Sequence, residues 1–298
     1  MSKKRTSATP WLTALLLCGA CGTLQAQTAD SAPNSDAPPE DTTMAETPPS
    51  PGEHISGTVG FDYASHFISY GGDVWGAGDE FYGTQSTTFG YVDLGVDLPN
   101  GFALTLGAWS DINNNAENSI GGNIQEIDVY GGLTYTTGAV TLGAVYQQWY
   151  YGGDTERVLD LSVGLDDSGF WGDSGFALNP SFVSHIRVNG QEGQDDGAAF
   201  VGSVEPGVTR SDDETLPLSL AFPSSIGFMT DDFQGGDGGF GYASIGATLG
   251  IGLDFIPVGY GDWSVAVNTT YYHTEEDVIP GNPEEDFVTG TVGIAMAF

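Results

Sequence analysis

Carboxylates at alternate positions are the most frequent groups in this chain that could do chemistry. Glu126 and Asp128 lie two residues apart and Asp93 and Asp97 lie four apart, within stretches that alternate large apolar with small residues. Positions two apart in a β-strand point to the same face of the sheet, so each pair shares a face. Such carboxylates serve as acid–base groups, as metal ligands or as a surface that attracts cations.

The histidines do not pair a base with a nucleophile. They are His54, His66, His185 and His273. His66 adjoins Ser65 where a strand enters a loop. His185 shares a strand face with Arg187, whereas Ser184 points to the opposite face. Neither spacing specifies a nucleophile and the base that would activate it, so we expect no enzymatic activity.

Metal binding has one candidate stretch, TDDFQGGDGGF, with Asp231, Asp232 and Asp237. It lacks the alternating ligand positions before the glycine of a calcium-binding EF-hand loop, so a solvated loop is the other interpretation. The two cysteines, Cys18 and Cys21, both lie in the first 26 residues and supply no thiolate ligand to the remaining chain. We expect no metal and no cofactor.

The N-terminal segment has the pattern of an export signal. Lys3, Lys4 and Arg5 precede an apolar stretch, 11–24, that is too short to span a bilayer. We expect a signal peptide over residues 1–26 that is cleaved after Ala26, with a lipoprotein signal at Cys21 as the alternative. Residues 27–54 are rich in Pro, Ser, Thr and acids, which predicts a disordered acidic leader, with a plug inside a lumen as the alternative.

The charge balance excludes one class of partner. The chain has 40 acidic and six basic residues among 298, and removal of the signal gives a net charge of 3 − 40 = −37. Nucleic acid would be repelled by this charge, so we expect no nucleic-acid partner. A cation-attracting surface and a saline habitat are the two explanations that remain. Charged residues are only 15% of the chain, well below the usual roughly 25% of soluble domains.

From Ile55 to Phe298, apolar alternation with a period of two recurs in about twelve segments near ten residues long. One example is 90–98, where Val92, Leu94 and Val96 alternate with Asp93 and Gly95. The connections alternate as well. Short ones cover 99–101 and 136–138, and long ones rich in glycine and acids cover 70–86, 113–124, 230–239 and 275–286.

The two strand faces do not suit a soluble sheet. One face carries large apolar residues, and the other carries Thr, Ser, Gly and Asp. Both faces are suitably placed if the apolar face meets lipid and the other face lines a lumen. Only a closed sheet leaves no backbone edge unpaired in hydrocarbon. The sequence therefore predicts an all-β, transmembrane, antiparallel up-and-down β-barrel over residues 55–298, with a secreted soluble β-sandwich as the alternative.

The closing stretch FVTGTVGIAMAF ends on Phe298 with apolar residues at alternate positions. It resembles the last strand of bacterial outer-membrane barrels. That resemblance implies outer-membrane localisation, contact with membrane lipid and recognition of Phe298 by the barrel-assembly machinery. SGTVGFDYASHFISYGGDVWG and TLPLSLAFPSSIGF are similar to the TorF-type porin family, although the acidic leader and the many aspartates depart from it.

Charged groups on the small-residue face predict the function. We expect the following residues to line the lumen: Asp62, Asp93, Asp97, Glu126, Asp128, Asp160, Asp166, His185, Arg187, Glu205 and Asp254. One arginine does not pair so many acids, so water or cations must compensate them. We expect a passive channel for small hydrophilic solutes that prefers cations. The alternatives are a narrow barrel filled by Tyr130, Gln147 and Trp149, and a non-conducting structural or adhesive barrel.

Overall fold

The structure, a computed structural model, describes residues 54–115, 120–172, 176–190, 196–210 and 217–298. The expected signal peptide, and the expected leader except His54, lie outside these residues. Within the described residues, no helix is long and apolar enough to cross a membrane.

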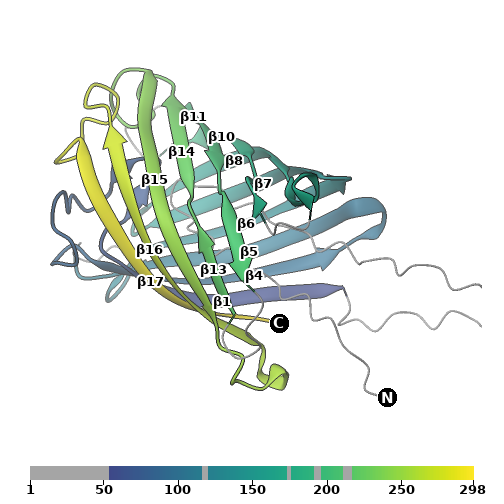
Figure 1. The fold of residues 1–298 in the computed structure, drawn as a ribbon. Helices are drawn as coiled ribbons and strands as arrows, with labels where there is room; N and C mark the ends of the chain where they lie inside the picture. The colour runs from purple at the N-terminus through teal and green to yellow at the C-terminus, as the bar shows by residue number, and fades with distance from the viewer. Residues whose placement is uncertain (1–53, 116–119, 173–175, 191–195, 211–216) are drawn as a thin grey trace, which may run out of the picture.

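The chain forms a closed antiparallel barrel with twelve wall positions, which confirms the predicted all-β barrel fold (Figure 1). Each strand pairs with its neighbours in sequence, and β1 pairs with β17 to close the sheet. The wall strands are β1 (Ile55–Ala64), β4 (Thr87–Asp97), β5 (Phe102–Ile112), β6 (Ile124–Thr137), β7 (Val140–Tyr151), β8 (Asp154–Leu165), β9 (Phe176–Ala177) with β10 (Ser181–Asn189), β11 (Gly197–Val204) with β12 (Gly207–Arg210), β13 (Leu218–Ala221) with β14 (Ser224–Met229), β15 (Gly239–Gly252), β16 (Asp262–Thr274) and β17 (Asp286–Ala297).

Three neighbouring wall positions are each divided into two short strands. Pro180, Pro206 and Pro223 lie in the breaks, and proline cannot donate a backbone hydrogen bond to a ladder. The carbonyl oxygens of all three prolines still accept bonds from the adjacent strand, at 3.0, 2.8 and 2.7 Å. Hydrogen bonding between neighbouring wall positions therefore continues across the breaks.

The barrel has two different ends. We call the end with the segments 65–86, 230–238 and 275–285 the loop end. The opposite end, at which β1 begins and β17 ends, we call the turn end. Short elements in the connections are β2 (Ile68–Ser69), β3 (Gly72–Asp73), η2 (Pro99–Gly101), η3 (Ser168–Phe170) and η5 (Val258–Tyr260). Sorting by length is not strict, since only Gly152 and Gly153 join β7 to β8 at the loop end, whereas 253–261 joins β15 to β16 at the turn end.

Strand alternation turns the apolar residues outward. Phe61 and Tyr63 on β1 are 55% and 48% exposed, whereas Asp62 between them is 4% exposed. The same alternation exposes Leu94 on β4, Leu106 on β5 and many others around the outer surface. The outer wall is therefore apolar, and the polar groups of the strands face the barrel interior.

Aromatic side chains on the inner face lie over glycines of the adjacent strand. A Cβ atom on Gly107 would lie 2.3 Å from the Tyr130 ring, and one on Gly60 would lie 2.3 Å from the Tyr91 hydroxyl. Only glycine leaves the sheet open for such a ring to lie flat, and the ring covers backbone that glycine leaves bare. These glycines therefore set the direction in which the inner aromatic residues lean.

Phe298 lies at the seam where the barrel closes. Its backbone N–H and C=O both bond to Gly57 on β1, each at 3.0 Å. Its ring covers Gly57 on the outer face, where a Cβ atom would lie 2.3 Å from the ring. The last residue thus continues the β1–β17 ladder, and its ring remains 57% exposed on the outer surface.

Candidate functional site

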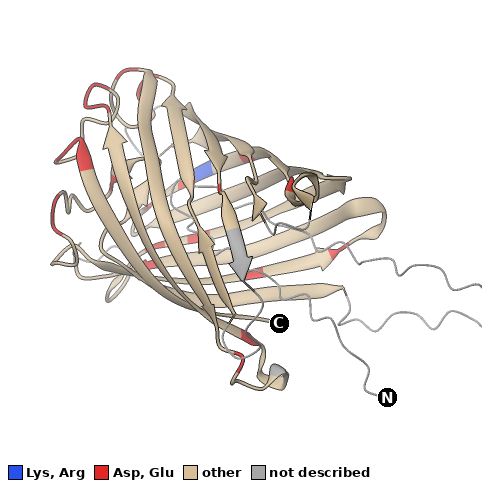
Figure 2. Ribbon diagram, viewed as in Figure 1, with Lys and Arg blue, Asp and Glu red and all other residues tan. Residues whose placement is uncertain are grey.

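The acidic residues gather on one part of the inner wall. We call the inner faces of β1, β4 to β8 and β10 the acidic half, and the inner faces of β11 and β14 to β17 the hydroxyl half. Of the sequence-predicted residues, those that are buried on the inner face of the acidic half are Asp62, Glu126, Asp128, Asp160, His185 and Arg187. Asp93 is half-buried on the same half, and Glu205 is half-buried at the break after β11. Figure 2 shows acidic segments on these strands as well as in the connections.

Three predicted residues lie apart from this group, at the turn end. Asp97 is the exposed last residue of β4. Asp166 and Asp254 are also exposed, and they lie in turns because β8 ends at Leu165 and β15 at Gly252. The Asp166 carboxylate accepts bonds from the Ser168 hydroxyl at 2.6 Å and its N–H at 3.0 Å.

Asp167 anchors the same turn. Its carboxylate accepts backbone N–H bonds from Leu178 and Asn179, each at 2.8 Å, and an indole N–H bond from Trp171 at 2.7 Å. Desolvation opposes its ionisation, but these hydrogen bonds outweigh it and hold the pKa of Asp167 below its usual value.

Sequence reasoning missed two inner carboxylates, Asp111 and Glu156. Both are buried, with 0% and 2% exposure. Strand alternation could have identified both residues. Asp111 is an even number of positions from Thr105 on β5, and Glu156 is an even number of positions from Asp160 on β8, so each points to the inner face. We missed them because these strands extend further toward the loop end than the apolar alternation indicated.

A buried ion pair connects β8 with β10. The Arg187 Nε donates to Glu156 Oε1 at 2.8 Å, and its Nη1 donates to the Phe233 carbonyl at 3.0 Å. The guanidinium also lies over the Phe233 ring, 4.4 Å from the ring centroid. The only basic residue that we predicted for the lumen is therefore engaged by a wall acid and by the loop 230–238.

His185 joins a second network. Its Nδ1 lies 2.6 Å from Asp160 Oδ1 and also contacts the hydroxyl of Tyr70, which reaches across from the segment 65–86. The other oxygen of Asp160 accepts a bond from the Gln147 amide at 2.5 Å, and Gln147 in turn accepts one from Trp149 at 3.0 Å. The carboxylate, the imidazole and the tyrosine thus fix the segment 65–86 to the far wall.

The segment 65–86, which we call the inner loop, folds into the loop end of the barrel. Its Trp75 indole donates to Asp111 at 2.9 Å. Gln234 donates to the Ser69 carbonyl at 2.7 Å, and Asn282 donates to the Gly71 carbonyl at 2.9 Å. The inner loop therefore contacts β5 and the loops 230–238 and 275–285.

The start of the inner loop contains Ser65 and His66, which are adjacent in the chain. The Ser65 hydroxyl lies 2.7 Å from His66 Nδ1 and accepts the Gly290 N–H at 2.8 Å, while His66 Nε2 lies 2.9 Å from the Gly78 carbonyl. Both side chains are buried, with 0% and 3% exposure. Their hydrogen bonds connect the start of the inner loop to Gly290 on β17 and to the Gly78 carbonyl.

Asp73 is the last residue of β3 and pairs with Ile68 at the open end of the β2–β3 hairpin in the inner loop. It is 6% exposed, and one carboxylate oxygen accepts the Gly78 N–H at 2.8 Å. Desolvation raises the pKa of Asp73, although the backbone N–H groups and the charge of His66 act in the opposite direction. Docking of the loop is therefore favoured when Asp73 is protonated.

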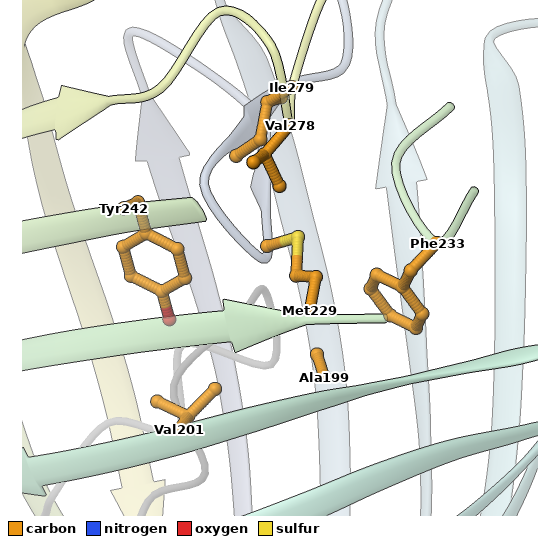
Figure 3. Packing of buried hydrophobic residues seen from close by; sticks show 7 residues of the cluster. All are labelled: Ala199, Val201, Met229, Phe233, Tyr242, Val278 and Ile279. Atoms are coloured by element: carbon orange, nitrogen blue, oxygen red, sulfur yellow. The ribbon is translucent and has the colours of Figure 1, made fainter. Parts of the chain in front are cut away.

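An apolar cluster fills the loop end of the hydroxyl half. Figure 3 shows Met229 on β14 pointing toward Val278 and Ile279 of the loop 275–285. The other members are Ala199, Val201, Phe233 and Tyr242. On the opposite side, a second cluster joins the inner loop to the wall through Phe67, Phe89 and Trp109. Apolar packing on both sides thus narrows the loop end.

Inner carboxylates elsewhere have fewer partners. The Tyr130 hydroxyl donates to Asp93, and Glu126 shares a hydrogen bond with Asp128. Oδ1 of Asp128 and the hydroxyl of Tyr91 are buried without a hydrogen-bond partner among the described residues. These groups retain hydrogen-bonding capacity that the surrounding wall does not use.

The structure also places Asp231 and His273, which the sequence analysis named. Asp231, from the calcium-like stretch, accepts the Gly238 N–H at 2.7 Å. In the part of the chain that the structure describes, no group of three or more His, Cys, Asp or Glu residues is arranged to hold a metal ion. His273 lies on the outer face near the loop end, 2.9 Å from Asp286.

No family model matches the chain, and no curated protein matches it, so the resemblance to the TorF-type family is not confirmed. Similar solved structures include a NanC porin, with 9% identity, a TM-score of 0.43 and coverage of 81% of this chain and 98% of that chain. The translocator domain of the autotransporter NalP from Neisseria meningitidis has 12% identity, a TM-score of 0.42 and coverage of 82% and 88%. An anion-selective porin from Comamonas acidovorans has 12% identity, a TM-score of 0.32 and coverage of 82% and 98%. Similarity at this level supports no conclusion about family or function.

Proposed function

We propose that this chain is a porin-like barrel of the bacterial outer membrane that passes small hydrophilic solutes and prefers cations. The observation that carries the proposal is the closed barrel with an apolar outer face and buried carboxylates on its inner face. Hydrocarbon tolerates only backbone whose hydrogen bonds are satisfied, which a closed sheet provides. An inner wall of polar groups with an apolar outer wall is typical of such barrels.

The cation preference follows from the inner charges. Asp62, Asp93 and the Glu126–Asp128 pair have no basic partner among the described residues, since Arg187 pairs with Glu156. Low-dielectric walls focus the potential of such charges and enrich cations locally. Screening limits the effect to about 8–10 Å at physiological salt. Twelve tilted strands enclose a cylinder only roughly 24 Å across between backbones, so most of the interior lies within that distance of the wall.

Planar-bilayer recordings on the refolded barrel test the channel function. We expect discrete conductance steps in KCl. A folded sample, verified by its circular dichroism and by its heat-dependent mobility on gels, that gives no steps would contradict the channel function.

A non-conducting barrel is the second candidate, and one observation favours it. The inner loop crosses the loop end and contacts the far wall through Tyr70 and His185. Replacing 69–80 with a short glycine–serine linker separates the two candidates. Conductance that is small in the natural chain and larger in the variant supports a channel narrowed by the loop. Absence of conductance in both the natural chain and the variant supports a structural or adhesive barrel.

Biogenesis forms part of the same proposal. We propose export by the cleaved signal 1–26, insertion into outer-membrane lipid and recognition of Phe298 by the barrel-assembly machinery. We also propose that the barrel has no enzymatic activity, because Ser65 and His66 are buried and bonded within the inner loop. Absence of lipid and peptide hydrolysis by the refolded protein is the expected result.

A further inference from the structure

A band of alternating carboxylates and tyrosines crosses the inner wall of the acidic half. Its members, in order from β1 to β6, are Asp62, Tyr91, Asp93, Tyr130 and Asp128. Tyr91 interacts electrostatically with Asp62 and Asp93, and Tyr130 with Tyr91, Asp93 and Asp128. The band is therefore continuous although its members come from three strands.

The band is continuous because its tyrosine side chains lean across the neighbouring strand. Tyr91 is opposite Gly60 in the β1–β4 register and its hydroxyl lies over that glycine, two residues from Asp62. Tyr130 crosses Gly107 on β5 and its hydroxyl reaches Asp93 on β4. Each tyrosine therefore places an aromatic ring between two carboxylates.

Two groups in the band have unused hydrogen-bonding capacity. The Tyr91 side chain is 5% exposed and its hydroxyl has no hydrogen-bond partner among the described residues. Asp62 is 4% exposed, and its carboxylate leans over Gly293 with no hydrogen bond or ion pair from a described residue. Buried polar groups in folded proteins are nearly always partnered, so these two call for a ligand that donates hydrogen bonds.

We propose that Asp62, Tyr91 and Asp93 form a binding site for a linear organic dication, an alkyl chain with an ammonium group at each end. The inference rests on the proposed channel function and names the class of solute that the acidic half recognises. Each ammonium donates charge-assisted hydrogen bonds to a carboxylate, and the one at Asp62 also donates to the Tyr91 oxygen. The alkyl chain runs past Tyr91, whose aromatic ring attracts a nearby cation.

The spacing of the two aspartates favours two separated charges over one. Asp62 is opposite Phe89 and Asp93 lies four residues further along β4, which corresponds to about 13 Å along the strand. A single small cation does not contact both carboxylates across this distance. Two ammonium groups joined by a flexible chain contact both, and the chain passes Tyr91 between them.

Isothermal titration calorimetry on the detergent-refolded full-length chain, at constant ionic strength in KCl, tests the site without measuring any current. The probes are straight-chain diammonium chlorides from ethane-1,2-diammonium to octane-1,8-diammonium, with methylammonium and Mg²⁺ for comparison. We expect the longer diammonium ions to bind at least about tenfold more tightly than methylammonium or Mg²⁺. Equal binding of all divalent probes would overturn the proposal, because a general negative potential predicts that result.

The substitutions Asp62→Asn and Asp93→Asn each remove one carboxylate at nearly constant shape. We expect each to weaken octane-1,8-diammonium binding about tenfold or more. Asp97→Asn is the matched control, since it removes the same charge from an exposed position four residues along the same strand. If Asp97→Asn weakens binding as much as Asp93→Asn, the site is wrong and only bulk charge matters.

Tyr91→Phe keeps the ring and removes the hydroxyl, and it is the variant least expected to disturb folding. We expect severalfold weaker diammonium binding with an unchanged potassium preference, whereas unchanged binding would remove Tyr91 from the site. The two proposals fail separately. Diammonium binding by a barrel that never conducts contradicts the channel alone, and conduction without diammonium binding contradicts the site alone.

Discussion

The two halves of the inner wall satisfy their polar groups in different ways. In the hydroxyl half, neighbours bond to one another, as between Ser225 and Ser244 at 2.7 Å and from the Asn268 amide to Thr248 at 2.8 Å. The acidic half has more carboxylates than basic partners, and Asp62 has neither a hydrogen bond nor an ion pair from the described residues. Polar groups in the hydroxyl half thus find hydrogen-bond partners in the wall itself. Carboxylates in the acidic half depend on water, cations or a solute in the interior.

This difference separates stability from function. Uncharged hydroxyl pairs each contribute about 1 kcal/mol and create no field. Buried carboxylates are costly to desolvate and are retained at low stability gain, so their presence on one half is better explained by a solute than by folding. The following predictions compare the halves, beginning with the largest expected effect.

Breaking the buried ion pair of the acidic half should have the largest effect on stability. Arg187→Met leaves Glu156 buried and unpaired, which should lower the free energy of unfolding by about 3–5 kcal/mol in urea titrations of the refolded barrel. Adding Glu156→Gln removes both charges, and we expect most of the lost stability to return. A double variant as unstable as the single one would show that packing, not charge, holds this site.

A substitution at the seam between the halves, where β1 pairs with β17, should lower the free energy of unfolding by less. Phe298→Ala removes a ring that is 57% exposed, so we expect a loss of only about 1–2 kcal/mol of unfolding free energy. Assembly in cells should fall by a larger factor, measured as the fraction of folded barrel in the outer membrane. Phe298→Tyr is the control that retains an aromatic end, and normal assembly of Phe298→Ala would contradict a recognition role.

The hydroxyl half should tolerate substitution better. Ser225→Ala removes the hydroxyl that bonds to Ser244 and to Tyr242, and we expect a loss of about 1 kcal/mol in urea titrations. Ion preference should remain unchanged, because no charge is altered. A change in reversal potential for this variant would mean that the hydroxyl half contributes to selectivity after all.

Substitution of Asp73 in the inner loop should have the smallest effect. The stability of loop docking should depend on pH through this residue. Because desolvation raises the pKa of Asp73 in the docked loop, the stability of docking is fully present below the ordinary aspartate pKa and is lost as pH rises through the raised value. Asp73→Asn should remove this dependence and slow amide exchange of the loop at neutral pH a fewfold, by mass spectrometry. Faster amide exchange in Asp73→Asn would show that protonation of Asp73 weakens the docking of the loop, contrary to this account.

Alternation in the sequence predicted the barrel well because strand faces are a local property. The period of two around Val92 to Val96 and in the last strand fixed which side chains point outward. Local pattern also predicted two short turns at 99–101 and 136–138. The structure has short turns at 98–101 and 138–139, both at the turn end. The predicted lumen role of the inner residues stays a prediction.

Contacts across the barrel could not be predicted from the sequence. Tyr70 and His185 are 115 residues apart, and their contact depends on barrel diameter and on the path of the inner loop. The apolar residues Phe67 and Ile68, just before the predicted connection 70–86, were a signal in the sequence that this segment enters the interior. The proline breaks also escaped us, since Pro206 and Pro223 lie within stretches that alternate as continuous strands.

The reversal potential of single channels across a KCl gradient tests the central claim most directly. The natural chain should prefer K⁺ over Cl⁻ at moderate salt, and the preference should fade in concentrated salt. The combined change of Asp62, Asp93 and Asp128 to Asn should reduce the permeability ratio severalfold. The same change at Asp97, Asp166 and Asp254, which are exposed at the turn end, should have little effect. Anion preference in the natural chain, or equal effects of the two triple variants, would contradict the account.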